Sequence, residues 1–314
     1  MLRGSAFAPA TISNFFTIDH GKGFSEGDLH ETGATGGGYV LSEGVVTRAT
    51  ARRGVGPTVL RITVNGDSSY RARTTETAVK LLLADAGESS WRIELDQSVA
   101  VPIGSGFGAS AASALSAVMA VASALSVEMK AEEVAYAAHR ADILCKTGLG
   151  TVSVIYKHGG AGVIVKPGAP GISRVRRVPA AKDIRIVTAS LAPYKKSRLL
   201  SAPEMASRVN ELGLEAMRIA DGPTLENLMK AGEFFATELG LASPRLRRLS
   251  GVAKMTGALG ASQNMVGEAL HAVVHERAAR TVADGLRSAE PAAKIGIYSL
   301  SSGPATVLPA ASVP

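Results

Sequence analysis

The sequence predicts an α+β protein built from two domains. Its 314 residues exceed what one core usually holds. Stretches with strand-like alternation are mixed with apolar helical runs. The predicted secondary structure changes near residue 180, beyond which helices dominate until the last strands. We therefore predict an N-terminal domain over 1–180 and a C-terminal domain over 181–314.

The N-terminal half is predicted to contain strands before and between a few helices. WRIELDQSVAV alternates apolar and polar residues as a half-buried strand does. TETAVKLLLADAG has helical spacing and ends at a glycine, a common helix stop. We expect strands over 5–20 (broken at Pro9), 39–51, 58–66 and 91–101, a loop over 21–38, and helices over 75–87, the apolar run up to 125, and 130–148.

The C-terminal half is predicted to follow the order strand, helices, strand, helix, strand. That order fits an α+β sandwich of the ferredoxin-like kind. We expect two short strands within 153–171, strands at 174–178 and 183–190, helices over 197–254 with breaks near 222–223 and 243–244, a glycine loop at 255–262, a strand at 269–274, a helix at 276–289 and a final strand at 294–300.

Composition narrows the class of protein. The net charge of +7 suits an anionic ligand but is too diffuse to indicate nucleic acid, and only 4% of residues are aromatic. The basic clusters RVRRV and RLRRL are expected on a solvated strand edge or helix face. Cys145 is the only cysteine, which excludes an intrachain disulfide and a cysteine metal cluster. No signal peptide or membrane span is indicated, so we expect a soluble, cytoplasmic protein.

The stretch VAVPIGSGFGASAASALSAVMAVASAL, residues 99–125, is the strongest functional signal. Glycines at alternate positions lead directly into an apolar helix, whose first N–H groups favour an anion such as phosphate. Three hydroxyls, Ser105, Ser110 and Ser113, lie at the same junction. On spacing alone, a tight turn before a buried helix explains the pattern equally well.

Two well-known phosphate-binding motifs do not explain this stretch. No Gly-Lys-Ser/Thr follows the glycines, so a Walker A loop is excluded. Gly104-x-Gly106-x-x-Ala109 matches the dinucleotide fingerprint, but a second helix follows where a βαβ unit needs a strand. The Rossmann interpretation is therefore weak.

Two motifs resemble the GHMP kinases, a family named for galactokinase, homoserine, mevalonate and phosphomevalonate kinases. PIGSGFGASAA (102–112) resembles the family signature P-x-x-x-G-L-G-S-S-A-A, with Phe107 in place of Leu and Ala109 in place of the first Ser. KMTGALGAS (254–262) is similar to the C-terminal glycine loop of the family. The resemblance implies an N-terminal ribosomal-protein-S5-domain-2-like domain and a C-terminal ferredoxin-like α/β sandwich.

Further segments resemble the archaeal branch of the family that phosphorylates pantoate. They are APATISNFFTI, GATGGG, AHRADILCKTGLG, KPGAPG and GASQNMVGEAL, and together they cover most of the chain. The resemblance implies Mg-ATP as phosphoryl donor and the 4-hydroxyl of pantoate as acceptor, on the route to coenzyme A. Another GHMP kinase, with a mevalonate-type or homoserine-type substrate, is the first alternative.

The resemblance also implies roles for individual residues. Ser110 corresponds to the serine that contacts Mg²⁺ and phosphate, and Asp142 to a metal-binding acid that is glutamate in the family. Thr151 stands where several members carry a catalytic aspartate, so a silent ATP-binding homologue is the second alternative. The implied ATP-phosphate contacts are Pro102, Gly104, Gly106, Phe107, Gly108, Ala109, Ser110, Ala111, Ala112, Thr256, Gly257, Gly260 and Ser262.

The remaining candidates concern the acceptor. Because pantoate carries a carboxylate, the site should hold a cation, and Lys166 and then Arg48 are the candidates. Thr11, Ser13 and Asn14 are candidates for substrate hydroxyls, with strand pairing an equal alternative. Asp19 or His20 could replace the missing base, and His139 is expected to be a packed residue. No nucleic-acid or membrane partner is expected, and a homodimer stays open.

Overall fold

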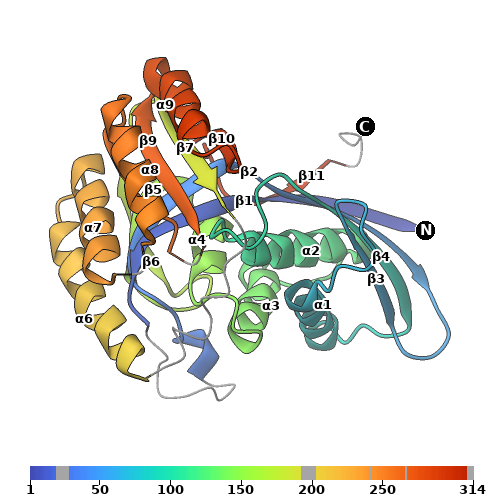
Figure 1. The fold of residues 1–314 in the computed structure, drawn as a ribbon. Coiled ribbons are helices and arrows are strands. Elements are labelled where there is room, and N and C mark those ends of the chain that lie inside the picture. Colours follow the sequence, from blue (N-terminus) through green and yellow to red (C-terminus); the bar gives the residue numbers. More distant parts are fainter. Residues whose placement is uncertain (19–27, 192–202, 241, 266, 310–314) are drawn as a thin grey trace.

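The computed structural model describes residues 1–18, 28–191, 203–240, 242–265 and 267–309 (Figure 1). Its first sheet has seven strands, in the order β11-β1-β2-β4-β3, with β5 beside the other end of β2 and β6 beside β5. Among the strands of the described residues in this sheet, only β3 and β4 pair in parallel. The strands are β1 (Leu2–Phe16), β2 (Gly36–Arg53), β3 (Val59–Val64), β4 (Trp91–Val99), β5 (Gly160–Lys166), β6 (Arg174–Val178) and β11 (Thr306–Leu308).

Of the first three long helices, the second packs on one face of this sheet, and the other two pack on that helix and on each other. They are α1 (Arg73–Asp85), α2 (Ala109–Leu125) and α3 (Ala131–Leu144), and the short helix α4 (Thr151–Lys157) follows; a 3-10 turn, η1 (Asp28–His30), precedes β2. Alanines let α2 lie close to β1, where a Cβ at Gly4 would be 2.2 Å from the Ala120 carbonyl oxygen. Hydroxyls of Thr47 on β2 and Ser116 on α2 are 2.7 Å apart. These contacts hold α2 against β1 and β2.

The second sheet has the antiparallel order β10-β7-β9-β8. Its strands β7 (Ile184–Ser190), β8 (Gly260–Gln263), β9 (Ala269–His275) and β10 (Lys294–Ser299) are joined by helices α6 (Pro203–Ile219), α7 (Leu225–Glu238), α8 (Pro244–Met255) and α9 (Glu276–Ala289). Strand, helices, two strands, helix and strand make the β-α-β-β-α-β order of a ferredoxin-like sandwich. The predicted α+β fold class is confirmed.

A continuous core joins the two sheets. Helices α8 and α9 cover one face of the second sheet (Figure 1), where Val187, Leu249 and Val282 are buried together. The main core extends from α2 and the first sheet to α6, α7 and the other face of the second sheet. Phe235 of α7, for example, packs on Phe16 of β1 with ring centroids 5.7 Å apart.

Three predicted elements are wrong in detail. The first of the two strands expected within 153–171 is helix α4, because Val152 and Ile155, one helical turn apart, are both buried. Residues 260–263 form strand β8 rather than a loop. The strand at 294–300 is not the last, since β11 pairs with β1 through Ser5 and Leu308. The domain boundary at 180 stays a prediction.

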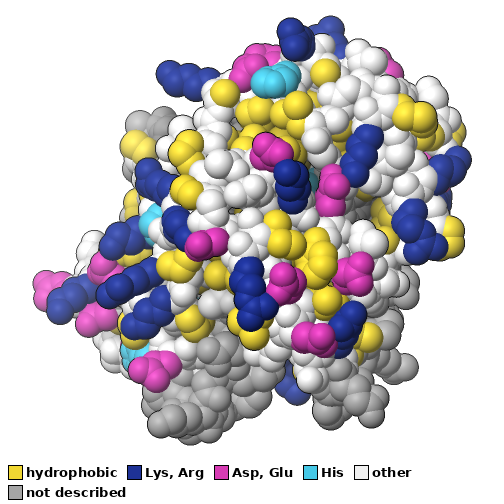
Figure 2. Space-filling model, turned by 90° about the vertical axis from the view of Figure 1, so that its left-hand side faces the viewer, with side chains coloured by type: hydrophobic (Ala, Val, Ile, Leu, Met, Phe, Trp, Pro, Cys, Tyr) yellow, Lys and Arg dark blue, Asp and Glu magenta, His cyan; other side chains and the backbone are white. Residues whose placement is uncertain are grey.

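Basic side chains are distributed among acidic ones. Figure 2 shows this on the face at the left of Figure 1, which carries α6 and α7. The two basic clusters lie on β6, an edge strand, and on α8, as predicted. Arg176 pairs with Asp221 and Arg245 with Glu290. Within the described ranges, no helix is both long enough and apolar enough to cross a membrane.

Candidate active site

The first glycine loop forms the turn that starts α2. Gly104, Gly106 and Gly108 all have left-handed backbone angles, with φ of 79°, 79° and 61°. Gly108 is the N-cap, no side chain caps the helix, and its first turn contains no acidic residue. Ser110, in that first turn, is exposed. The positive end of the helix dipole is therefore left for an anion.

Two threonines from distant segments meet at Gly108. A Cβ at Gly108 would lie 2.4 Å from Oγ1 of Thr11 on β1 and 3.1 Å from Cγ2 of Thr151 on α4. The Thr11 N–H also donates to the Phe107 carbonyl at 3.0 Å. Thr11 and Thr151, both selected from the sequence, thus lie beside the predicted phosphate site.

Two residues of the predicted phosphate set also make contacts within the protein. The Phe107 side chain is buried in the core, where it packs on Tyr298 with ring centroids 5.9 Å apart. The Ala112 N–H donates to the Gly108 carbonyl at 3.1 Å, as the first bond of the helix. The Ala112 N–H is thus bonded within the helix, and the helical N–H groups suited to an anion end at Ala111. The phosphate contact of Phe107 concerns its backbone, and the assignment of both residues stays a prediction.

Asp142 is a buried carboxylate at the end of α3. Its Oδ1 accepts a 2.6 Å hydrogen bond from the Thr147 hydroxyl. A Cβ at Gly148 would lie 2.3 Å from Asp142 Oδ2, so the glycine is needed for the loop to fold over the carboxyl group. Burial raises the pKa of Asp142 to about 6, although the bond from Thr147 opposes the rise. A carboxylate held this way is costly to the fold, which is typical of a functional group.

The second glycine segment differs from the expectation. The Thr256 hydroxyl donates to the Val252 and Ala253 carbonyls at the end of α8, and Gly257 follows as an exposed turn with φ of 114°. Gly260 is buried against α7, and the Ser262 hydroxyl donates to the Gly232 carbonyl of that helix. Three of these residues thus contact neighbouring parts of the C-terminal half, while Gly257 is exposed. The role of all four at the ATP phosphates stays a prediction.

The turn after β8 meets the first glycine loop instead. Asn264 Nδ2 donates to the Ser105 carbonyl at 3.2 Å. A Cβ at Gly267 would be 2.3 Å from the carbonyl carbon of Ser105, so no side chain fits there. Sequence reasoning missed Asn264 and Gly267, although both lie in the segment GASQNMVGEAL that carried part of the resemblance.

Two of the acceptor candidates, Asn14 and Arg48, have partners within the protein, and their role toward the acceptor stays a prediction. Asn14 is fully buried, and its Nδ2 donates to the Tyr39 hydroxyl at 3.1 Å and to the Leu228 carbonyl at 3.2 Å. Arg48 pairs with Asp96 of β4 at 3.9 Å. Its neighbour Thr47 points at α2, and since successive strand residues point to opposite faces, Arg48 faces away from α2.

The other acceptor candidates stay open. The Ser13 carbonyl accepts from the Met265 N–H at 3.4 Å, while its side chain is half-buried. Lys166 is exposed at the end of β5, two residues beyond Ile164, whose side chain lies beside Gly150. Asp19 and His20 lie outside the described residues. His139 is packed as expected: its Nε2 donates to the Leu29 carbonyl at 3.1 Å, and burial lowers its pKa to about 4.

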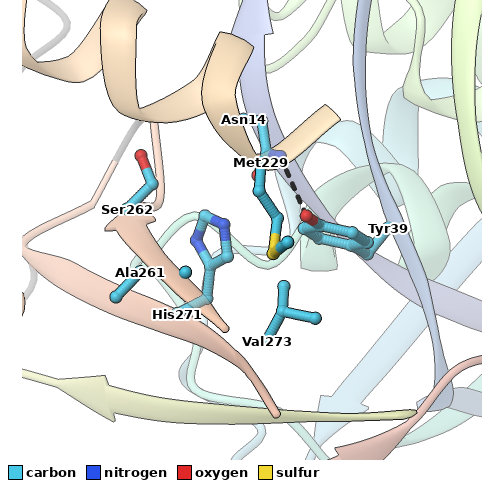
Figure 3. A pocket seen from close by; sticks show the side chains of 8 residues that line it. Asn14, Tyr39, Met229, Ala261, Ser262, His271 and Val273 are labelled. Carbon is cyan, nitrogen blue, oxygen red and sulfur yellow. Dashed lines mark hydrogen bonds between the residues drawn. The ribbon is translucent and has the colours of Figure 1, made fainter. Parts of the chain in front are cut away.

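A small pocket lies where the two sheets meet, and it is too tight to admit a water molecule. Figure 3 shows Asn14 and Tyr39 from the first sheet facing Met229 of α7 and His271 of β9. The rings of Tyr39 and His271 meet edge to face at 5.5 Å. This pocket is a packed polar joint between the halves rather than a ligand site.

Comparison with known proteins identifies the family. A family model described as the GHMP kinases N terminal domain matches residues 73–157, which include the first glycine loop and Asp142. The chain is 30% identical over 251 residues to a pantoate kinase of Methanospirillum hungatei, covering 79% of each chain. The chain belongs to the GHMP kinase family.

Two further matches cover nearly the whole of this GHMP kinase. A pantoate kinase of Methanocaldococcus jannaschii is 26% identical over 85% of this chain and 91% of its own. A solved structure described as a phosphotransferase related to the CoA biosynthesis pathway has a TM-score of 0.85 at 24% identity, covering 99% of this chain and 100% of that one. Because this similarity extends over the whole chain, it supports the fold of the N-terminal and the C-terminal halves.

Proposed function

We propose that this GHMP kinase transfers the γ-phosphoryl group of ATP to the 4-hydroxyl of pantoate, forming 4-phosphopantoate for coenzyme A biosynthesis in the cytoplasm. The identity to curated pantoate kinases over most of the chain supports the acceptor. The observation that carries the proposal is the uncapped N-terminus of α2, with Thr11 and Thr151 against Gly108. Such an end suits the phosphates of ATP.

Mg²⁺ is expected to accompany ATP at this end of α2. Within the described ranges no three acidic, histidine or cysteine side chains group closely enough to hold a metal by themselves. Mg²⁺ in kinases is commonly held by one or two carboxylates together with the substrate phosphates. The Ser110 hydroxyl and the Asp142 carboxylate are the candidates here, and the ion would neutralise charge on the phosphates.

The chain's own contribution is mainly positioning. Threonine cannot take a proton at neutral pH, so Thr151 is not a general base. A loose, metaphosphate-like transition state depends on alignment and charge stabilisation more than on a base. The N–H groups of Ala109, Ser110 and Ala111 would hold the phosphates, and Lys166 is our candidate for the pantoate carboxylate.

An acceptor panel tests this proposal. We expect ADP formation, followed in a coupled assay, with pantoate and much less with mevalonate or homoserine. Faster turnover of mevalonate or homoserine would indicate another GHMP activity. No turnover of any acceptor while ATP still binds would favour a silent homologue, the alternative that Thr151 supports.

Replacing Ser110 by alanine is expected to lower turnover about 100-fold, since a lost transition-state contact of this kind costs about 3 kcal/mol. The side chain is exposed, so the thermal unfolding midpoint should hardly change. Ser123→Ala, at an exposed position near the other end of α2, is the matched control. Wild-type turnover in Ser110→Ala would contradict the phosphate site.

A further inference from the structure

The turn between β8 and β9 is tied to the first glycine loop by one buried asparagine. Asn264 is fully buried, and its Nδ2 lies 3.2 Å from the Ser105 carbonyl oxygen, 159 residues away in the chain. Its Oδ1 lies 2.9 Å from Nδ1 of His271, which is also buried. His271, Asn264 and Ser105 therefore form a chain of two hydrogen bonds between the halves of the protein.

The chemistry of these groups fixes the direction of both bonds. A carbonyl oxygen can only accept, so Asn264 must turn its NH₂ group toward Ser105. Its carbonyl oxygen then faces His271, and Nδ1 of that ring must carry the proton. Burial lowers the pKa of His271 to about 3, so the imidazole stays neutral near pH 7. One tautomer and one amide orientation satisfy the whole chain of bonds.

Steric contact reinforces the hydrogen bonds. A Cβ at Gly106 would lie 2.9 Å from the Asn264 Cβ and 3.3 Å from the Gly267 nitrogen, so the loop and the turn are in close contact. His271 is itself held, because Tyr39 packs against its ring and Asn14 donates to the Tyr39 hydroxyl (Figure 3). A movement of Asn264 would pass directly to the glycines that start α2.

We propose that His271 and Asn264 are positioning residues that hold the Ser105–Gly108 turn in the shape that receives the phosphates. His271 touches no reacting group and acts only through Asn264. The consequence for nucleotide binding rests on the function proposed above. The consequence for the shape of the turn does not depend on it.

Two substitutions of His271 distinguish the effect of losing its hydrogen bond to Asn264 from the effect of changing the side-chain volume. His271→Leu removes the donor, whereas in His271→Asn the Nδ2 atom occupies about the place of Nδ1 and restores it. We expect His271→Leu to weaken ATP binding about tenfold, the typical value of one buried hydrogen bond. The KM for the acceptor should change much less, and His271→Asn should recover most of the affinity.

Amide hydrogen exchange gives a readout without ATP. The Thr11 N–H donates to the Phe107 carbonyl and so reports on the turn, whereas the Asn65 N–H, bonded to the Gln97 carbonyl at 2.8 Å, reports on a remote strand pair. His271→Leu should speed exchange at Thr11 about tenfold relative to Asn65, for the same hydrogen-bond reason. His275→Leu, at the other end of β9 and paired there with Asp183, is the control and should leave that ratio unchanged.

Three results would overturn the proposal. The first is an equal increase of the exchange rates at Thr11 and Asn65 in His271→Leu, which would mean general destabilisation. The second is a His271→Asn variant as impaired as His271→Leu. The third is an unchanged exchange rate at Thr11 in His271→Leu. If the wild-type protein bound no ATP, the proposed function would fail, while the exchange ratio would still decide whether His271 holds the turn.

Discussion

Gly108→Ala is expected to remove most of the activity, lowering kcat/KM at least about 100-fold, the effect of displacing a reacting group by about 1 Å. An alanine at φ of 61° costs about 1–2 kcal/mol. Its Cβ would also lie 2.4 Å from Oγ1 of Thr11 and 3.1 Å from Cγ2 of Thr151. The start of α2 must shift to relieve these contacts, and the phosphate-binding N–H groups shift with it.

Steady-state kinetics at varied ATP concentration measure the loss of kcat/KM, and thermal unfolding measures the loss of stability. Gly251→Ala is a matched control, because Gly251 lies within α8 with open space where its Cβ would be. That variant should keep its activity and gain up to about 1 kcal/mol from helix propensity. Wild-type kcat/KM in Gly108→Ala would show that the left-handed turn is not part of the site.

Asp142→Asn is expected to change activity and stability in opposite directions. Asparagine can still accept the hydrogen bond from Thr147 but carries no negative charge for a metal. We expect turnover to fall about 100-fold or more, on the scale of other lost electrostatic contacts in active sites. The fold, in contrast, should become more stable at neutral pH.

The sign of the stability change follows from proton linkage. Burial raises the pKa of Asp142 from 3.8, its ordinary value, to about 6 in the folded protein. Between those pH values the folded state binds more protons than the unfolded state, so stability falls as the pH rises through that window. At pH 7 the ionised carboxylate thus costs roughly 1–3 kcal/mol, which the asparagine removes.

Two measurements check this prediction. In the wild-type protein kcat/KM should rise with pH through about 6, as Asp142 ionises in the free enzyme. Denaturant unfolding at pH 7 should show the gain in Asp142→Asn and none in Asp96→Asn, which removes an exposed carboxylate of β4. Wild-type activity in Asp142→Asn would remove Asp142 from the site, and a destabilised variant would contradict the proposed cost of burying its charge.

Local sequence patterns predicted most elements well. Helix α9 occupies the predicted 276–289, and the breaks before α7 and α8 fall at the predicted Gly-Pro and Ser-Pro pairs. Helix α4 was missed because VSVIY is rich in β-branched and aromatic residues, which favour a strand in isolation. Its burial against the rest of the core overrides that preference.

The candidate site, like the fold, was predictable from the sequence where it depends on local segments and not where it depends on contacts between distant residues. The first glycine loop was predictable because its chemistry is that of the local backbone, with a turn and a helix start in one segment. The contact of Asn264 with Ser105 joins residues 159 positions apart, so no local pattern could predict it. The direction of the Arg48 side chain was not predictable for a related reason: the face to which a strand residue points depends on packing, and Thr47 points toward α2.

The most direct test of the central claim is to follow the backbone amides by NMR as Mg-ATP is titrated into the wild-type protein. The largest shifts are expected at Ala109, Ser110 and Ala111, where the N–H groups of α2 would meet the phosphates, with smaller shifts at Thr11 and Thr151. If ATP binds with its largest shifts at Thr256 and Gly257 and none at the start of α2, the account is contradicted.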